Sequence, residues 1–254
     1  MHGACVMKRH DAPGNQGRDP ATLPTHVLSQ AELLTRTIAS LHARGWCDGT
    51  GGNFSCVVQR APLILLMAPS GVDKGEVEAG MLIQVNGAGE VVSGQGRASA
   101  ETLLHLAIIQ TTGAGAVLHT HSQSATLLSQ APVGWLQTSA DMPRQAGEAT
   151  RYLPLRDLEM LKGLRGVSTH ATTVALPVLA NDQNLERLSA RARPLLRDAP
   201  FGLLIAGHGL YAWGDNLQEA KRHLESLEFL LEQRWRRLLL EALWGPSELP
   251  EGPA

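Results

Sequence analysis

The chain has 254 residues, of which 43% are hydrophobic and 18% are charged, so it can fold around a sizeable core as a globular protein. A net charge of −2 gives no electrostatic reason to bind nucleic acid or an anionic membrane, and we expect neither a signal peptide nor a membrane span. The cysteines (Cys5, Cys47 and Cys56) lack the spacing of a zinc ribbon, and we interpret them as reduced thiols in a cytoplasmic protein.

Composition divides the chain into three parts. Residues 1–24 are rich in glycine, proline and polar side chains and are expected to be disordered, and residues 243–254 are expected to form a flexible tail. Neither an internal repeat nor a long linker separates these ends. Residues 25–242 are therefore expected to form a single domain.

The first predicted elements are a helix and a β-hairpin. Ser29 and Glu32 form a capping box at the start of the helix, and Gly45 is expected to end it. The runs "FSCVV" and "LILLM" are rich in residues that favour strands and are separated by a turn at Pro62. Together they predict a hairpin.

The middle of the chain alternates helices and strands. A second helix is predicted from Ser99 to the break at Gly113, followed by a buried strand at "AGAVLHTH" and a short helix at "SQSATLLSQ". Residues 131–156 show no clear period and are expected to form a loop with at most one short strand. A helical piece at "LEMLKGL" and a strand at "TTVALPVL" are predicted next.

The last third of the chain predicts two helices with strands between them. "NLERLSARARPLL" is predicted as a helix with a solvated arginine-rich face, ended by Pro194 and the residues that follow it. "FGLLIAGHGLYAWG" predicts two strands, or one bent strand, broken at Gly207–Gly209. From Leu217 to Leu238 apolar residues recur at spacings of three and four after Asp215 as N-cap, which predicts a helix packed on the sheet or in a coiled coil. The pattern is that of an α/β fold with helices interleaved among mixed strands.

Three histidines stand out as candidate metal ligands. His119 and His121 alternate at the end of a predicted strand, so their side chains share one face. His208 lies between glycines that let the backbone turn sharply and bring the ring close to another element. Histidines without clustered cysteines favour a catalytic zinc site with an open position. Histidines hydrogen-bonded to the backbone are the alternative.

Seven motifs together resemble the class II aldolase/adducin family. They occur in the family's order between about Ser29 and Leu239: "GTGGNFS", "PSGVDKG", "ASAET", "AVLHTHS", "EMLKG", "NDQ" and "GHGLYAWGDNLQEA". The motifs "SGVDKG", "EMLKG" and "NDQ" are similar to those of the family's dehydratases, which remove water from a phosphorylated ketose. The resemblance implies one α/β domain with a central mixed, largely antiparallel sheet flanked by helices, and a homotetramer.

The resemblance also implies roles for the metal site. His119, His121 and His208 are expected to bind one zinc ion per subunit, and Glu159 in "EMLKG" to act as general acid/base. Loss of water from a ketose phosphate begins with removal of a proton beside the carbonyl, and a carboxylate held nearby can take that proton. Glu101 lies where the family's aldolases keep their acid/base glutamate. Its alternative role is a carboxylate that favours the first turn of a helix.

The phosphate of the substrate needs a loop that donates hydrogen bonds. The segment "GTGGN" has no helix after it, so it is neither a P-loop nor a dinucleotide fingerprint. The resemblance implies that Asn53, Ser70, Gly71 and Ser99 contact the phosphate, because backbone amides at a turn and at a helix start suit an anion. Lys74 is expected either to add a positive charge there or to face solvent.

Two other functions remain open at the level of sequence. A class II sugar-phosphate aldolase or epimerase would use the same histidines and phosphate loops, because retro-aldol cleavage also develops charge on the substrate's carbonyl oxygen. A non-catalytic interaction module of the adducin type would keep the fold without the chemistry. The intact histidines and glutamates argue against the second alternative.

Overall fold

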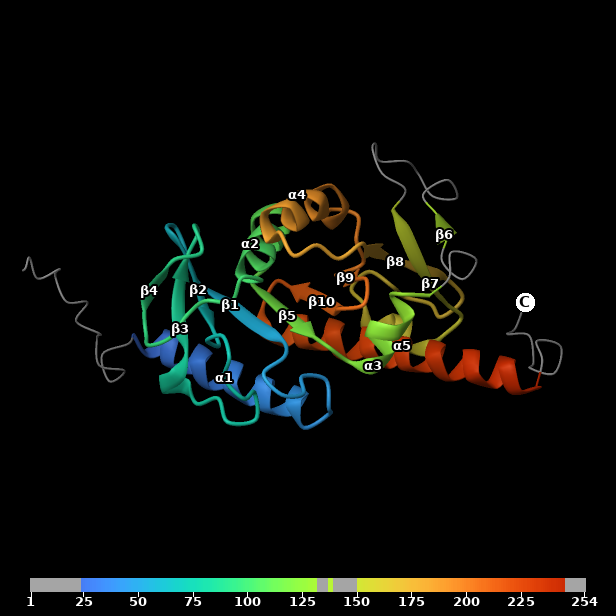
Figure 1. Cartoon of the computed structure of the whole chain (residues 1–254), viewed down its shortest axis with the longest axis horizontal. Helices are drawn as coiled ribbons and strands as arrows, with labels where there is room; N and C mark the ends of the chain where they lie inside the picture. Colours follow the sequence, from blue (N-terminus) through green and yellow to red (C-terminus); the bar gives the residue numbers. More distant parts are fainter. Residues whose placement is uncertain (1–23, 132–136, 139–149, 245–254) are drawn as a thin grey trace, which may run out of the picture.

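The computed structural model describes residues 24–131, 137–138 and 150–244. Within these residues, ten strands form one sheet in the order β4-β3-β2-β1-β5-β10-β9-β8-β7-β6 (Figure 1). The strands are β1 (Asn53–Arg60), β2 (Leu63–Met67), β3 (Ile83–Asn86), β4 (Val91–Ser93), β5 (Ala116–Thr120), β6 (Gln137–Thr138), β7 (Arg151–Arg156), β8 (Thr173–Leu179), β9 (Gly202–Ile205) and β10 (Gly209–Gly214).

The sheet is mixed but largely antiparallel. Of the strand pairs in the described residues, β8 and β9 run parallel and the others antiparallel. β1 and β2 form the predicted hairpin, and "FGLLIAGHGLYAWG" forms the two strands β9 and β10. The α/β fold class expected from the sequence is confirmed.

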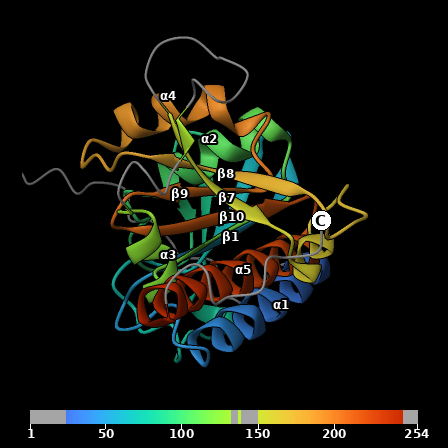
Figure 2. The ribbon, with the colours of Figure 1, turned by 90° about the vertical axis from the view of Figure 1, so that its right-hand side faces the viewer.

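Helices cover both faces of the sheet, as Figure 2 shows. They are α1 (Thr25–His42), α2 (Thr102–Thr112), α3 (Gln123–Leu128), α4 (Leu185–Leu196) and α5 (Leu217–Trp244), with short 3₁₀ helices η2 (Ala79–Met81) and η5 (Glu159–Gly163). α1 and α5 pack with one apolar layer and α2 and α4 with another, which leaves the sheet between two cores. α5 packs on the sheet, which was one of the two predictions for this helix, the other being a coiled coil.

Strand β5 lies at the centre of the sheet and ends at the histidines. All its residues are buried, and His119 pairs with Asn53 of β1 on one side and with Tyr211 of β10 on the other. Neighbouring strands therefore fix the backbone of His119 from both sides. The three predicted metal-binding histidines come together at this end of β5.

The predicted cap of the first helix was wrong. α1 begins at Thr25 after Pro24, whose carbonyl oxygen accepts from the amides of Val27 and Leu28. Proline suits a helix start, because its fixed φ is close to the helical value and its missing N–H would have no partner there. Ser29 therefore lies inside the helix and does not cap it.

One further helix end differs from prediction, and α4 ends where its predicted segment ends. α4 runs through Pro194 to Leu196, which is buried and packs the last turn against the core. The α5 cap is Asn216, whose side-chain oxygen accepts from the backbone N–H of Glu219. Asp215 instead pairs with Arg165, 2.5 Å from one guanidinium nitrogen.

Some expected segments lie partly outside the described residues. This holds for most of residues 1–24 and 243–254 and for Cys5, while α5 runs to Trp244. Between 131 and 156, where at most one short strand was expected, the described parts contain two strands, β6 and the six-residue β7. Strands β3 and β4 were not predicted. No helix in the described parts combines the length and the apolar character needed to span a membrane. Cys47 and Cys56 are buried free thiols.

Candidate metal centre

The three predicted histidines come together at one end of the central strands. His119 lies near the end of β5, His121 follows the strand, and His208 lies in the turn between β9 and β10. This turn fits because Gly209 has no side chain: a Cβ there would lie 2.0 Å from the carbonyl oxygen of Thr120. Glycine thus permits the close approach of β10 that sets His208 beside the β5 histidines.

The ring nitrogens of these histidines converge. The Nε2 atom of His119 lies 2.8 Å from Nε2 of His121 and 3.4 Å from Nε2 of His208. Tetrahedral zinc with Zn–N bonds of about 2.0–2.1 Å separates its ligand nitrogens by about 3.3 Å. The spacing is therefore close to that of ligands around one ion.

Glu101 joins the histidines as a fourth donor. Its Oε1 atom lies 2.8 Å from Nε2 of His208 and 3.5 Å from Nε2 of His119. The amide of Asn53 donates a hydrogen bond to its other oxygen, Oε2. The four donor atoms of Glu101, His119, His121 and His208 all lie within 4.8 Å of one another.

Neighbouring groups orient His119 for binding through Nε2. Its Nδ1 atom lies 2.9 Å from the carbonyl oxygen of Leu210, and we assign the N–H to this nitrogen because a carbonyl can only accept. The ring is stacked on Tyr211, with centroids 3.8 Å apart. A histidine held in this way presents the lone pair of Nε2 to a metal.

The electrostatics also suit a cation. Burial lowers the pKa of His121 to about 3, and charge on the other two histidines adds to the effect, so its imidazole is neutral and free to coordinate. Burial alone would raise the pKa of Glu101, but hydrogen bonds with His119 and His208 hold it well below its usual range. Imidazoles and an ionised carboxylate fit a divalent ion such as zinc, and other ions of the same charge bind similar sets.

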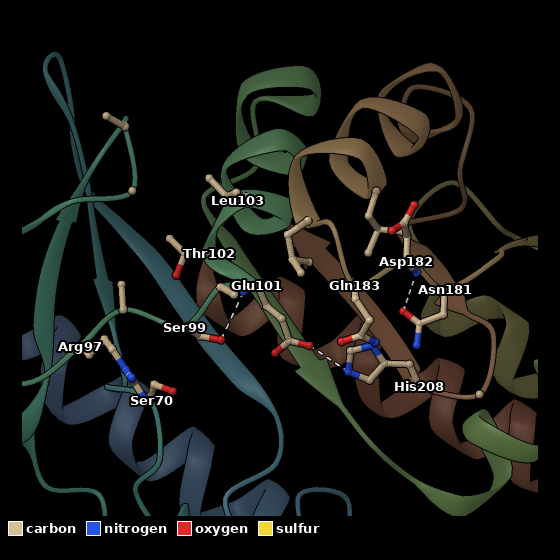
Figure 3. Close-up of a pocket in the computed structure, with 17 residues that line it drawn as sticks. Ser70, Arg97, Ser99, Glu101, Thr102, Leu103, Asn181, Asp182, Gln183 and His208 are labelled. Carbon is tan, nitrogen blue, oxygen red and sulfur yellow. Dashed lines mark hydrogen bonds and ion pairs between the residues drawn. The ribbon is translucent and has the colours of Figure 1, made fainter.

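A cavity of about 780 Å³ opens beside Glu101 and His208. Figure 3 shows Ser70 and Arg97 on one wall and Gln183 beside His208 on the other. The lining is mixed, and its polar side chains also include Ser99, Asn181 and Asp182. It offers hydrogen-bond donors and acceptors around a carboxylate that faces the open space.

The expected phosphate residues lie around this cavity in different ways. Ser70 and Ser99 line it, and Asn53 is buried with its amide turned to Glu101. Gly71 forms a turn with φ of 78°. Each of these positions lies on a loop or at a strand or helix end.

Lys74 does not face solvent, so that alternative was wrong. The residue is 2% exposed, and its ammonium donates to the carbonyl oxygens of Thr50 and Val72 at 2.9 and 3.0 Å. It thereby ties the "GTGGN" loop to the "PSG" turn. Burial lowers its pKa, while the negative charges of Asp73 and Glu101 oppose the shift.

Glu159 lies outside the group of four donors. It is on η5, its side chain is 71% exposed, and its carboxylate pairs with Lys162 and, at 3.8 Å, with His170. The side chains of Lys162 and His170 are themselves more than two-fifths exposed. The contacts within the described chain therefore do not connect Glu159 with the metal centre.

Sequence reasoning did not single out Arg97 or the segment 181–183 as site residues, although both line the cavity. The motif "NDQ" was noted only for its resemblance. Its loop is held by Asp182, whose carboxylate contacts the Arg187 guanidinium at 2.5 and 2.6 Å. The sequence signal for this loop was an acidic residue shortly before a predicted helix with an arginine five positions later, a spacing that allows an ion pair.

The chain belongs to the class II aldolase and adducin N-terminal domain family, whose pattern it matches over residues 32–235. It is 38% identical over 221 residues to methylthioribulose-1-phosphate dehydratase of Pectobacterium carotovorum, covering 85% of this chain and 99% of that protein. It is 42% identical over 222 residues to the protein of the same name in Granulibacter bethesdensis, covering 84% of this chain and 97% of that one.

Solved structures share the fold. L-fuculose-1-phosphate aldolase from Thermus thermophilus superposes with a TM-score of 0.61 at 26% identity, covering 85% of this chain and 97% of that one. An aldolase II superfamily protein from Pseudomonas syringae superposes with a TM-score of 0.69 at 19% identity, covering 92% and 84%. The second likeness concerns the fold alone.

Proposed function

We propose that this protein is a zinc-dependent hydro-lyase that converts 5-methylthioribulose 1-phosphate to 2,3-diketo-5-methylthiopentyl 1-phosphate in methionine salvage. The observation that carries the proposal is the convergence of three histidines and Glu101 beside a cavity that also has polar side chains in its lining. It occurs in a chain that spans nearly the full length of relatives named methylthioribulose-1-phosphate dehydratase. The same centre alone would also serve an aldolase.

His119, His121 and His208 would hold the metal ion. A bound zinc ion supplies a Lewis acid that stabilises negative charge developing on the substrate's carbonyl oxygen. The chain fixes the ion's place through the Leu210 carbonyl and the Tyr211 ring, which orient His119. The walls of the cavity then decide which carbon of the substrate faces the carboxylates.

Proton transfer needs a base beside the carbonyl carbon. Glu101 faces the cavity beside the metal ligands, which places it to take that proton and return one to the departing hydroxyl. For Glu159 as the general acid/base, the support is its place in the "EMLKG" motif and not its contacts in one subunit. We retain Glu159 as the proposed acid/base of dehydration and Glu101 as the second catalytic carboxylate.

The phosphate would bind at the wall formed by Ser70, Arg97 and Ser99. Ser99 precedes the first turn of α2, whose backbone N–H groups and dipole favour an anion. Arg97 adds a guanidinium, which pairs well with phosphate. Asn53, Gly71 and the buried ammonium of Lys74 would support the same wall from the neighbouring loops.

We further propose a cytoplasmic homotetramer that acts on a small phosphorylated ketose and binds neither nucleic acid nor membrane. Burial raises the pKa of Cys47 and Cys56 to about 12, which fits thiols that stay reduced. The net charge of −2 fits the absence of polyanionic partners. Size-exclusion chromatography with light scattering would measure the oligomeric state.

The direct test is to incubate the zinc-loaded protein with methylthioribulose 1-phosphate and follow formation of the diketone. Fuculose 1-phosphate and ribulose phosphates serve as comparison substrates under the same conditions. Diketone formation without cleavage of the sugars supports the dehydratase. Cleavage or epimerisation of the comparison substrates without diketone formation would replace it by the aldolase or epimerase.

That second candidate has a specific observation in its favour. Glu101, the residue at the aldolase position, lies in the centre, while Glu159 is exposed. A non-catalytic module is tested by metal analysis of the purified protein. A protein that holds no stoichiometric zinc or similar ion and turns over none of these substrates would be such a module.

A further inference from the structure

A buried carboxylate lies on the opposite side of the metal-bearing strand from Glu101. Glu228, on α5, is 1% exposed, and it has no ion-pair partner within the described part of the chain. Its two oxygens each accept one hydrogen bond of 2.5 Å, from the hydroxyls of Thr120 and Ser122. No step of the proposed reaction uses this group.

The two hydroxyls flank a metal ligand. Thr120 and Ser122 stand on either side of His121, and Thr120 directly follows His119. Ser122 also caps α3 by accepting from the backbone N–H of Ala125 at 3.2 Å. The carboxylate of Glu228 thus joins the end of β5 and the start of α3 to α5, and His121 lies between these two joints.

The cost of burial shows what this carboxylate contributes. Burial raises the pKa of Glu228 to about 7 although both hydroxyls oppose the shift, so an ionised carboxylate is costly at this position. An apolar side chain of similar shape would fill the same position without this cost. What the carboxylate adds is the pair of directed hydrogen bonds to residues 120 and 122.

We propose that Glu228 is a positioning residue for the metal centre, which through Thr120 and Ser122 holds the backbone of His119 and His121 so that their rings meet at one ion. The inference rests on the metal site of the proposed function. It assigns to α5, on the far face of the sheet, a part in metal affinity. The fold as such would be kept by the apolar contacts of the same helix.

The test compares Glu228→Leu with Glu228→Gln. The leucine keeps the volume and removes both hydrogen bonds, and the glutamine amide can accept from one hydroxyl and donate to the other. Zinc affinity, measured by competition with a chelator at about pH 8, should fall by about 10–100-fold in Glu228→Leu, the usual range for losing a partner of a metal ligand. Glu228→Gln should stay within a few-fold of wild type. The Co²⁺-substituted Glu228→Leu protein should also show an altered visible absorption band.

Leu227→Ala is the matched control. Leu227 is fully buried next to Glu228 on α5 and packs towards Gly202, so its truncation lowers stability without touching either hydroxyl. Its zinc affinity should equal that of wild type when both proteins are fully folded. Wild-type zinc affinity and a wild-type Co²⁺ spectrum in Glu228→Leu would overturn the inference. If wild-type protein itself binds no zinc, the proposed metal site fails instead.

A double-mutant cycle locates the effect. Thr120→Val removes one hydroxyl at nearly constant shape, and it should lower zinc affinity less than Glu228→Leu does. Adding Thr120→Val to Glu228→Leu should cause little further loss, because the bond is already absent. Fully additive losses would show that the two residues act separately and would refute the positioning role.

Discussion

Two glutamates lie on opposite sides of strand β5, and their surroundings make them chemically different. Glu101 shares its site with His208 and His119 at 2.8 and 3.5 Å, and its pKa lies well below the usual range. Glu228 meets hydroxyls, and its pKa is raised to about 7. Burial pushes both upwards, so the partners decide the direction of the net shift.

The geometry of a strand produces this contrast. Successive side chains of a strand point to opposite faces, so His119 turns towards Glu101 while Thr120 turns towards Glu228. One side of the strand end therefore carries groups suited to bind a cation, and on the other side a carboxylate accepts hydrogen bonds from two hydroxyls. The first carboxylate is therefore suited to chemistry, and the second to holding the end of the strand in place.

The largest effect is expected from removing a metal ligand. His119→Ala, His121→Ala or His208→Ala should each strip the ion and abolish dehydration, because a catalytic zinc site ordinarily needs three protein ligands. Circular dichroism should show that the fold remains. Metal content by mass spectrometry checks the cause. A variant with full metal occupancy and normal turnover would remove its histidine from the site.

Glu159→Gln should give the next largest loss. The amide keeps the shape but cannot take a proton, so turnover should fall by about 100-fold or more if Glu159 is the acid/base. Glu101→Gln, in the metal centre, is the paired measurement and should lower turnover less. Solvent deuterium exchange into the substrate shows which variant has lost the proton-transfer step.

The outcomes separate the two proposed bases. Loss of exchange in Glu159→Gln with exchange retained in Glu101→Gln supports the dehydratase assignment. The opposite pattern moves the base to Glu101, as in the aldolases, and weakens the dehydratase proposal. Unchanged turnover in Glu101→Gln would contradict a catalytic role for the carboxylate in the centre.

The sequence predicts the elements around the site better than it predicts their contacts. The alternation of His119 and His121 on a strand and the glycines around His208 singled out these rings, and the family resemblance was needed to place them in one site. These signals are local, because strand periodicity and glycine each act over a few residues. The same holds for α2, whose end at Gly113 in the left-handed region was expected.

Contacts between distant elements were not predictable from periodicity. Glu228 lies more than 100 positions from both hydroxyls it meets, so only the packing of α5 on the sheet brings them together. Of the two expectations for Lys74, the one of a solvent-facing side chain was wrong, because the residue is buried between two loops. The predicted cap of α5 was wrong by one residue, because Asp215 and Asn216 are both good capping residues and stand next to each other.

The titration of Glu228 makes the stability of the folded protein depend on pH, and Glu228→Gln should remove this contribution. The folded pKa of about 7 lies above the ordinary value of 4.5, so the protonated group's contribution is full below 4.5 and is lost as pH rises through 7. Glutamine does not titrate. As the pH rises from about 5 to 8, the difference in unfolding free energy between Glu228→Gln and wild type should therefore shift in favour of the variant by up to about 3 kcal/mol.

Denaturant unfolding of the metal-free proteins checks this gain, and chelator in every sample keeps metal binding out of the comparison. Titration of the histidines affects both proteins and cancels in the difference. Leu227→Ala should differ from wild type by an amount that does not vary with pH, because it removes no titratable group. A pH-independent difference for Glu228→Gln would mean that its carboxylate is not buried as described.

The smallest expected effects concern the groups that hold the substrate beside Glu101. Ser99 lines the cavity, and Ser99→Ala should raise KM by about tenfold, or about 1.4 kcal/mol, at unchanged kcat, because a phosphate contact persists through the reaction. Asn53 differs because its amide donates to Glu101. Asn53→Ala should therefore raise KM and also lower kcat. Steady-state kinetics of both variants measure the split, and a loss confined to kcat in Ser99→Ala would place that residue at the reacting carbons instead of at the phosphate.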